Sequence, residues 1–114
     1  MVTKVTAALE LHMSIEETLV YPLVEREEGA DVRNEAEVEH GLARDGIATL
    51  NNMVDEPGFG AAAESLLGGL LHHVREEESE IFPALKDKLD AAAWSELGDQ
   101  VAAAHAAGAA PTAV

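Results

Sequence analysis

The sequence contains no cysteine among its 114 residues. This absence excludes disulfides, zinc–thiolate sites, cysteine-ligated iron–sulfur clusters and cysteine nucleophiles. It fits a reducing compartment, and the sequence shows neither a signal peptide nor an apolar run long enough to span a bilayer. We therefore expect a cytoplasmic protein without a membrane partner.

Basic residues are also scarce, because 7 lysines and arginines stand against 22 aspartates and glutamates, and the formal net charge is -15. Such a surface repels phosphate backbones and anionic lipids, so we expect no nucleic-acid partner. Most of these acids serve solubility. Any acid that points inward needs another explanation.

Aromatic residues make up only 4% of the chain, and alternating β-branched segments are nearly absent. Alanine, leucine and glutamate dominate instead, which favours helix. Much of the apolar share of 47% is alanine, so each helix can bury only a narrow stripe. Because the length fits one domain, we predict a single all-α domain.

Glycines and prolines divide the chain into three long helical stretches and a short C-terminal helix, over residues 2–26, 31–53, 60–89 and 91–107. Asp31 is the expected N-cap of the second stretch, and Pro22 and Pro83 should bend the first and third. We predict an antiparallel up-down helical bundle over residues 1–107 and a flexible tail over residues 108–114. We expect dimerisation to complete this bundle.

The apolar row of each long stretch is interrupted near its middle by residues that can bind metal ions. The expected rows run through Val2, Val5, Leu9, Leu19 and Leu23, then Ala36, Ala43, Ile47, Leu50 and Val54, then Leu66, Leu70 and Ile81. The interrupting residues are His12, Glu16, His40, His73 and Glu77. Each His-x-x-x-Glu pair places an imidazole and a carboxylate on one helix face. Burial of such groups is unfavourable unless a metal ion takes up their lone pairs.

Each of these signals also has a less specific explanation. A single histidine in an apolar row is more often an ordinary core or boundary residue, and a single His-x-x-x-Glu pair is usually a weak surface pair. Metal-binding residue types interrupt the apolar rows of three helices near their middles, and this coincidence favours a metal site. Carboxylate and imidazole suit manganese and zinc as well as iron, so the residue types leave the metal open.

Several neighbouring residues remain alternatives as ligands. His72 and Glu76 repeat the spacing one residue earlier, about 100° around the helix, so we expect them to face solvent or a partner subunit. His105 is expected at the surface, although it could fold back as an extra ligand. The remaining acids near the proposed ligands are expected to be solvated or to lie outside the ligand set: Glu17, Glu78, Glu80 and Asp45.

Other kinds of site find little support in the sequence. It contains no glycine-rich phosphate loop, no His-Glu-x-x-His motif, no nucleophile elbow and no EF-hand spacing. Inward glutamates also argue against heme, because a macrocycle pocket is more apolar.

Three segments resemble helices of hemerythrin-like (HHE cation-binding) proteins. Residues 9–22 resemble the second helix, in which a histidine precedes paired acids and an aromatic–proline step. Residues 38–40 resemble the Glu-His opening of the third helix, and residues 72–83 closely resemble the fourth. The resemblance covers about residues 5–97.

This resemblance implies a non-heme di-iron centre in an antiparallel four-helix bundle. His12, His40 and His73 would then be terminal iron ligands, and Glu16 and Glu77 would be bridging carboxylates. Members of the family carry, sense or react with oxygen, peroxide or nitric oxide, or respond to iron. We therefore expect a non-heme iron protein that binds, senses or reduces such a small oxidant, without predicting enzymatic turnover.

Family members normally begin with another helix that carries its own histidine ligand, whereas Met1 here directly precedes the second helix. We expect a homodimer partner to complete the bundle, because the apolar stripe would otherwise be exposed. The C-terminal helix could cover it instead, with His105, or the chain could be a truncated remnant with an impaired site. The alternative function is a metal-free helical dimerisation or interaction module.

Overall fold

The computed structural model describes residues 2–109, with side chains from residue 4 to residue 108. This part of the chain is helical throughout apart from short connections, which confirms the all-α prediction. The helical elements, in chain order, are α1 (Val2–Ile15), η1 (Glu16–Val20), α2 (Tyr21–Glu28), α3 (Ala30–Asn52), α4 (Phe59–Glu76), η2 (Glu77–Ile81), α5 (Phe82–Lys88) and α6 (Ala91–Ala109). None of the described helices is long and apolar enough to cross a membrane.

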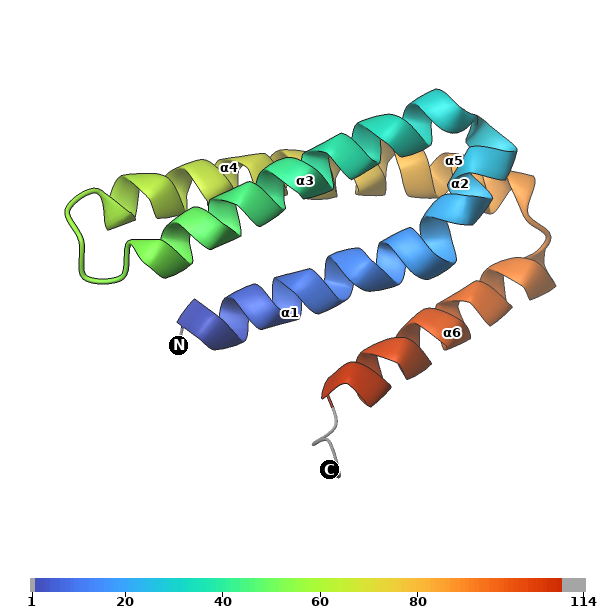
Figure 1. Cartoon of the computed structure of the whole chain (residues 1–114). Coiled ribbons are helices and arrows are strands. Elements are labelled where there is room, and N and C mark those ends of the chain that lie inside the picture. Colours follow the sequence, from blue (N-terminus) through green and yellow to red (C-terminus); the bar gives the residue numbers. More distant parts are fainter. Residues whose placement is uncertain (1, 110–114) are drawn as a thin grey trace.

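The elements form four rods that pack against one another (Figure 1). The rod α1–η1–α2 contacts α3, and in the rod α4–η2–α5 the first helix, α4, contacts α3 while α5 contacts α2. The fourth rod, α6, lies beside α1 and η1. The chain reverses direction between successive rods. Gly29 makes the first reversal with a φ of 108°, a conformation that favours glycine because it lacks a side chain.

Two π-helical segments interrupt the first and third rods, directly before the two prolines expected to bend them. The N–H of Tyr21 donates to the carbonyl of Glu16, and the N–H of Phe82 donates to the carbonyl of Glu77. The next residues, Pro22 and Pro83, have no N–H to continue the α-helical ladder. Such an i to i+5 turn inserts one extra residue, and π segments are frequent at functional sites.

The buried side chains form two clusters, one toward each end of the rods. The larger cluster consists of Val20, Tyr21, Val24, Ala36, Ile81, Leu85 and Leu97. The smaller one consists of Met13, Ala43 and Ile47. Both π segments begin between these clusters, so the residues that open them lie at mid-length in the interior.

The predicted apolar rows differ from the observed ones at three points. The π segment shifts the inward face of the first rod by one position, so Val20 and Val24 are buried where Leu19 and Leu23 were expected. Val5 is 56% exposed near the start of α1, and the side chain of Val2 lies outside the described residues. Val54 is 47% exposed because α3 ends at Asn52 and the helical periodicity stops there.

The start of α3 and the end of α6 differ from the predicted N-cap and tail. Asp31 does not cap α3, because the helix starts at Ala30 after Gly29, and no side chain makes the cap hydrogen bond. The C-terminal helix continues to Ala109, and residues 110–114 of the expected tail lie outside the described residues.

Candidate metal centre

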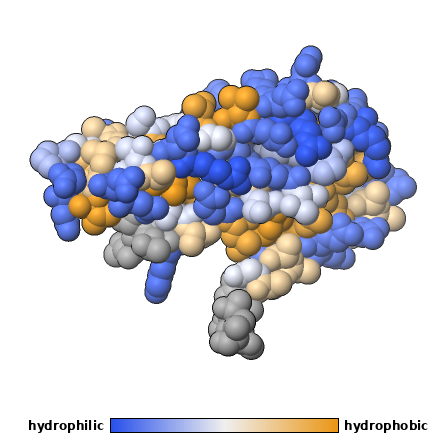
Figure 2. Space-filling view, viewed as in Figure 1, coloured by the Kyte–Doolittle hydropathy of each residue, from blue (hydrophilic) through white to orange (hydrophobic). Residues whose placement is uncertain are grey.

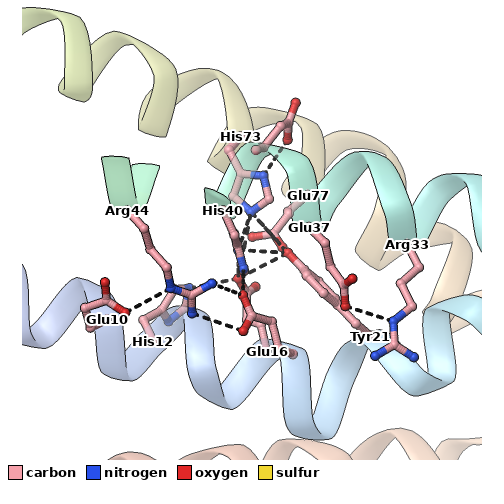
Figure 3. Close-up of polar contacts among 12 residues, drawn as sticks. Glu10, His12, Glu16, Tyr21, Arg33, Glu37, His40, Arg44, His73 and Glu77 are labelled. Atoms are coloured by element: carbon pink, nitrogen blue, oxygen red, sulfur yellow. Dashed lines mark hydrogen bonds and ion pairs between the residues drawn. The ribbon is translucent and has the colours of Figure 1, made fainter. Parts of the chain in front are cut away.

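Four buried side chains converge at mid-length of the molecule (Figure 3). Glu16 opens η1, His40 lies in the middle of α3, His73 lies in the last turn of α4, and Glu77 opens η2. Their relative exposures are between 1% and 5%. One potential ligand atom from each lies within 4.8 Å of the other three. Three separate rods thus bring two imidazoles and two carboxylates to one interior point.

The two imidazoles meet the carboxylates through their Nε2 atoms. His40 Nε2 lies 3.1 Å from Glu16 Oε1 and 3.1 Å from His73 Nε2. His73 Nε2 lies 3.3 Å from Glu77 Oε2. Nitrogen and oxygen atoms this close can all reach one cation of transition-metal size.

Acids on neighbouring helices hold the other nitrogen of each ring. Glu17 Oε2 lies 2.7 Å from His40 Nδ1, and Glu39 Oε1 lies 2.6 Å from His73 Nδ1. Arg44 donates to both oxygens of Glu17, at 2.7 and 3.0 Å. A histidine that binds metal typically makes such a bond through its other nitrogen, which fixes the ring and raises its basicity. Both Nε2 atoms are therefore directed inward.

The hydroxyl of Tyr21 lies at the centre of the four groups. It lies 2.9 Å from Glu77 Oε2, 3.0 Å from His40 Nε2, 3.2 Å from His73 Nε2 and 3.5 Å from Glu16 Oε1. The residue is 0% exposed. Burial, together with the charges of the two carboxylates, raises the pKa of Tyr21, so the phenol stays protonated.

Burial and hydrogen bonding set the ionisation of the other groups. Burial opposes charge on Glu16, but hydrogen bonds from His40 and His73 outweigh it and lower the pKa of Glu16. Burial and the nearby charge of Glu16 raise the pKa of Glu77. Burial disfavours a charged His73, yet hydrogen bonds to the carboxylates raise the pKa of this imidazole to about 11. The pocket thus retains a proton at neutral pH.

The fifth predicted residue, His12, lies beside this cluster rather than within it. Its Nε2 is 3.5 Å from Glu16 Oε1, and its side chain is 48% exposed. The imidazole stacks on that of His105 in α6, with ring centroids 5.5 Å apart. The structure therefore brings four of the five predicted residues together and places His12 between Glu16 and α6.

His72 faces solvent as expected, whereas the side chain of Glu76 is only 17% exposed. The side chain of His72 is 70% exposed and lies 3.3 Å from Glu76 and 3.6 Å from Glu39. These three residues also lie close enough to share a cation. Because the imidazole is in solvent, ordinary surface ion pairing accounts for this group.

Sequence reasoning missed four contributors to the site, namely Glu17, Tyr21, Glu39 and Arg44. Glu17 was expected to be solvated, and this expectation was wrong because it binds His40 and Arg44. For Tyr21 the sequence does contain a signal, the aromatic–proline step that recurs after each His-x-x-x-Glu pair. Asp45, which follows His40 by five residues, is exposed and lies outside the ligand set, as expected.

The donor set fits a cation. Glu16 Oε2 is buried without a hydrogen-bond partner among the described residues. The other oxygen of the same carboxylate, Oε1, lies near Nε2 of both His40 and His12. A buried carboxylate oxygen without a donor is unfavourable, and a metal ion would satisfy it. Two carboxylates and two imidazoles held through Nδ1 are ligands that suit iron, manganese or zinc.

Comparison with known proteins supports the same conclusion. The family model of the hemerythrin HHE cation binding domain matches residues 1–85. No curated protein and no solved structure matches the chain. The matched segment contains all four converging residues and His12. The chain therefore belongs to the hemerythrin HHE cation binding domain family.

Proposed function

We propose that this protein binds non-heme iron at a di-iron centre and uses it to bind, sense or reduce a small oxidant such as oxygen, peroxide or nitric oxide. The observation that carries the proposal is the buried convergence of Glu16, His40, His73 and Glu77 in a chain of this family. In the proposed assignment His12, His40 and His73 are terminal ligands, and Glu16 and Glu77 are shared carboxylates.

Iron bound there would supply the electron-transfer chemistry that the protein side chains lack. The side chains around the four converging residues orient the imidazoles and supply a hydrogen-bond donor. Glu17 and Glu39 keep His40 and His73 oriented through Nδ1. The phenol of Tyr21 remains protonated among the four groups, so it can donate a hydrogen bond to a small molecule held at the centre.

A pocket beside Glu16 supports a small, uncharged ligand. It has a volume of about 270 Å³ and opens between the first rod, α5 and α6. Its apolar lining includes Ile15, Val20, Phe82, Leu85 and Trp94. Such a lining favours oxygen or nitric oxide over a charged metabolite, because an ion would lose its hydration without gaining a partner.

The alternative is a metal-free helical interaction module, and one observation favours it. Five large apolar side chains are exposed on α3 and α4, namely Val38, Leu42, Leu67, Leu71 and Val74. Such a group is typical of a surface that contacts another protein. The same observation supports the expected homodimer, which remains a prediction, as does a cytoplasmic location.

Iron uptake distinguishes the two functions. Protein purified without a chelator and loaded anaerobically with ferrous iron should hold about two ions per chain, by analogy with di-iron bundles. H73A should lose most of this iron, whereas H72A should keep it, because the two neighbouring imidazoles differ in burial. Little iron in every preparation, with thermal stability unchanged on adding iron, would favour the metal-free module.

A further inference from the structure

The C-terminal helix places a second histidine pair next to the buried cluster. His105 of α6 stacks on His12 of α1, with ring centroids 5.5 Å apart and ring planes inclined by 27°. Figure 1 shows α6 running alongside α1. In the space-filling view of Figure 2, apolar side chains gather where α6 meets the rest of the molecule.

Packing fixes the position of α6 along α1, so the contact between these histidines follows from the fold. Leu97 is only 7% exposed, and Trp94 and Val101 pack against the larger core cluster. Near the far end, a Cβ atom on Gly108 would lie 2.6 Å from Leu11 Cδ1, so the Leu11 side chain packs directly against the backbone of α6 there. His105 lies between these contacts.

The carboxylate of Glu16 lies next to this histidine pair and has one oxygen without a hydrogen-bond partner among the described residues. Glu16 points Oε1 at His40, while this other oxygen, Oε2, is buried. His12, His105 and Glu16 line the same pocket. His12 Nε2 already lies 3.5 Å from the Glu16 carboxylate. Two imidazoles and a buried carboxylate thus face one space.

We propose that His12, Glu16 and His105 form a second cation position, in which α6 supplies a ligand from the same chain. This inference rests on the proposed function, because Glu16 would be shared with the Glu16–His40–His73–Glu77 cluster. The stacked rings must turn to aim their nitrogens at one ion, since metal–nitrogen bonds are about 2.0–2.1 Å. His12 is half exposed, so its side chain has room to turn.

Anaerobic titration with ferrous iron, followed by elemental analysis of desalted protein, tests this proposal. The unaltered chain should hold about two ions, and H105A and H105Q should each hold about one. H105Q keeps a side chain of comparable length, so it separates loss of a ligand from loss of packing. Q100A, which changes an exposed residue of α6, should still hold about two ions. Circular dichroism should show unchanged helicity in all variants.

The possible failures are distinguishable. Equal iron content in the unaltered chain and both His105 variants would contradict the second position and leave the proposed function standing. Loss of both ions from both variants would also contradict it, because the buried cluster does not contain His105. Absence of iron from the unaltered chain would contradict the proposed function itself.

Discussion

The first and third rods carry the same motif but place their histidines differently. In each rod a His-x-x-x-Glu pair is followed by an aromatic–proline step, and in each the glutamate opens a π segment and is buried. His73 is nevertheless buried, whereas the side chain of His12 is 48% exposed. The local sequence therefore sets the bend and the carboxylate, while the neighbouring helix determines the environment of the imidazole.

The neighbours explain this difference. His73 packs against α3, where Glu39 binds its Nδ1 and His40 approaches its Nε2. His12 faces α6, where its ring partner is His105. The pair in the third rod thus completes a closed cluster, while the pair in the first rod borders an apolar pocket.

The largest contrast should appear when each histidine is removed in turn. H73A should destabilise the metal-free protein by about 3 kcal/mol or more, because buried acids lose their charged partner. H12A should change stability by less than about 1 kcal/mol, since its side chain is half exposed. Urea unfolding without metal measures both values. Equal losses in the free energy of unfolding would show that His73 and His12 contribute alike, contrary to their difference in burial.

The acids that follow the two glutamates offer a second contrast. Glu17 binds His40 Nδ1, whereas its counterpart Glu78 is exposed. E17Q should weaken iron binding by about 10- to 100-fold, the usual effect of losing a carboxylate behind a metal-bound histidine. E78Q should leave it unchanged. Competition with a chromogenic chelator measures both affinities, and a weakening by E78Q as large as that by E17Q would contradict the assigned role of Glu17.

Several of these differences between the two rods could not be predicted from the sequence. Helical periodicity predicted the four rods and the residues of the buried cluster, because both follow from spacing along one chain. The roles of Glu17, Glu39 and Arg44 depend on which helices become neighbours, and spacing within one helix does not contain that information. Likewise, Leu19 and Leu23 were misplaced because a π segment changes the period on which the prediction relied.

The pH dependence of iron binding should reflect the raised pKa of His73 in the buried cluster. Because the pKa of His73 is raised to about 11, its proton must leave before the ring can bind metal at neutral pH. Affinity should therefore rise with pH, by at most about tenfold per unit for this proton, instead of levelling off above the ordinary imidazole value of 6.5. Calorimetry in buffers of different ionisation enthalpy measures the proton released, and its absence at pH 8 would contradict this account.

The same proton affects the stability of the metal-free fold. A raised pKa means that the folded state holds the proton more tightly than the unfolded chain does. This contribution is fully present below about pH 6.5 and is lost as pH rises through about 11. H73A should remove it.

The smallest effect concerns the aromatic residues of the two rods, Tyr21 and Phe82. Y21F makes the first rod resemble the third and removes the hydroxyl that bridges the four groups. Metal-free stability should fall by about 1–2 kcal/mol, the usual contribution of buried hydrogen bonds. F82Y is the reciprocal control and should not affect the buried cluster. Thermal unfolding checks both, and unchanged stability of Y21F would show that the hydroxyl does not hold the metal-free cluster together.

Anomalous diffraction at the iron absorption edge, from crystals of the iron-loaded protein, would locate the bound iron. We expect a strong peak within coordination distance of Glu16, His40, His73 and Glu77. A peak found only at the Glu39–His72–Glu76 group around the exposed His72, or no peak in the described interior, would contradict iron binding by the buried cluster.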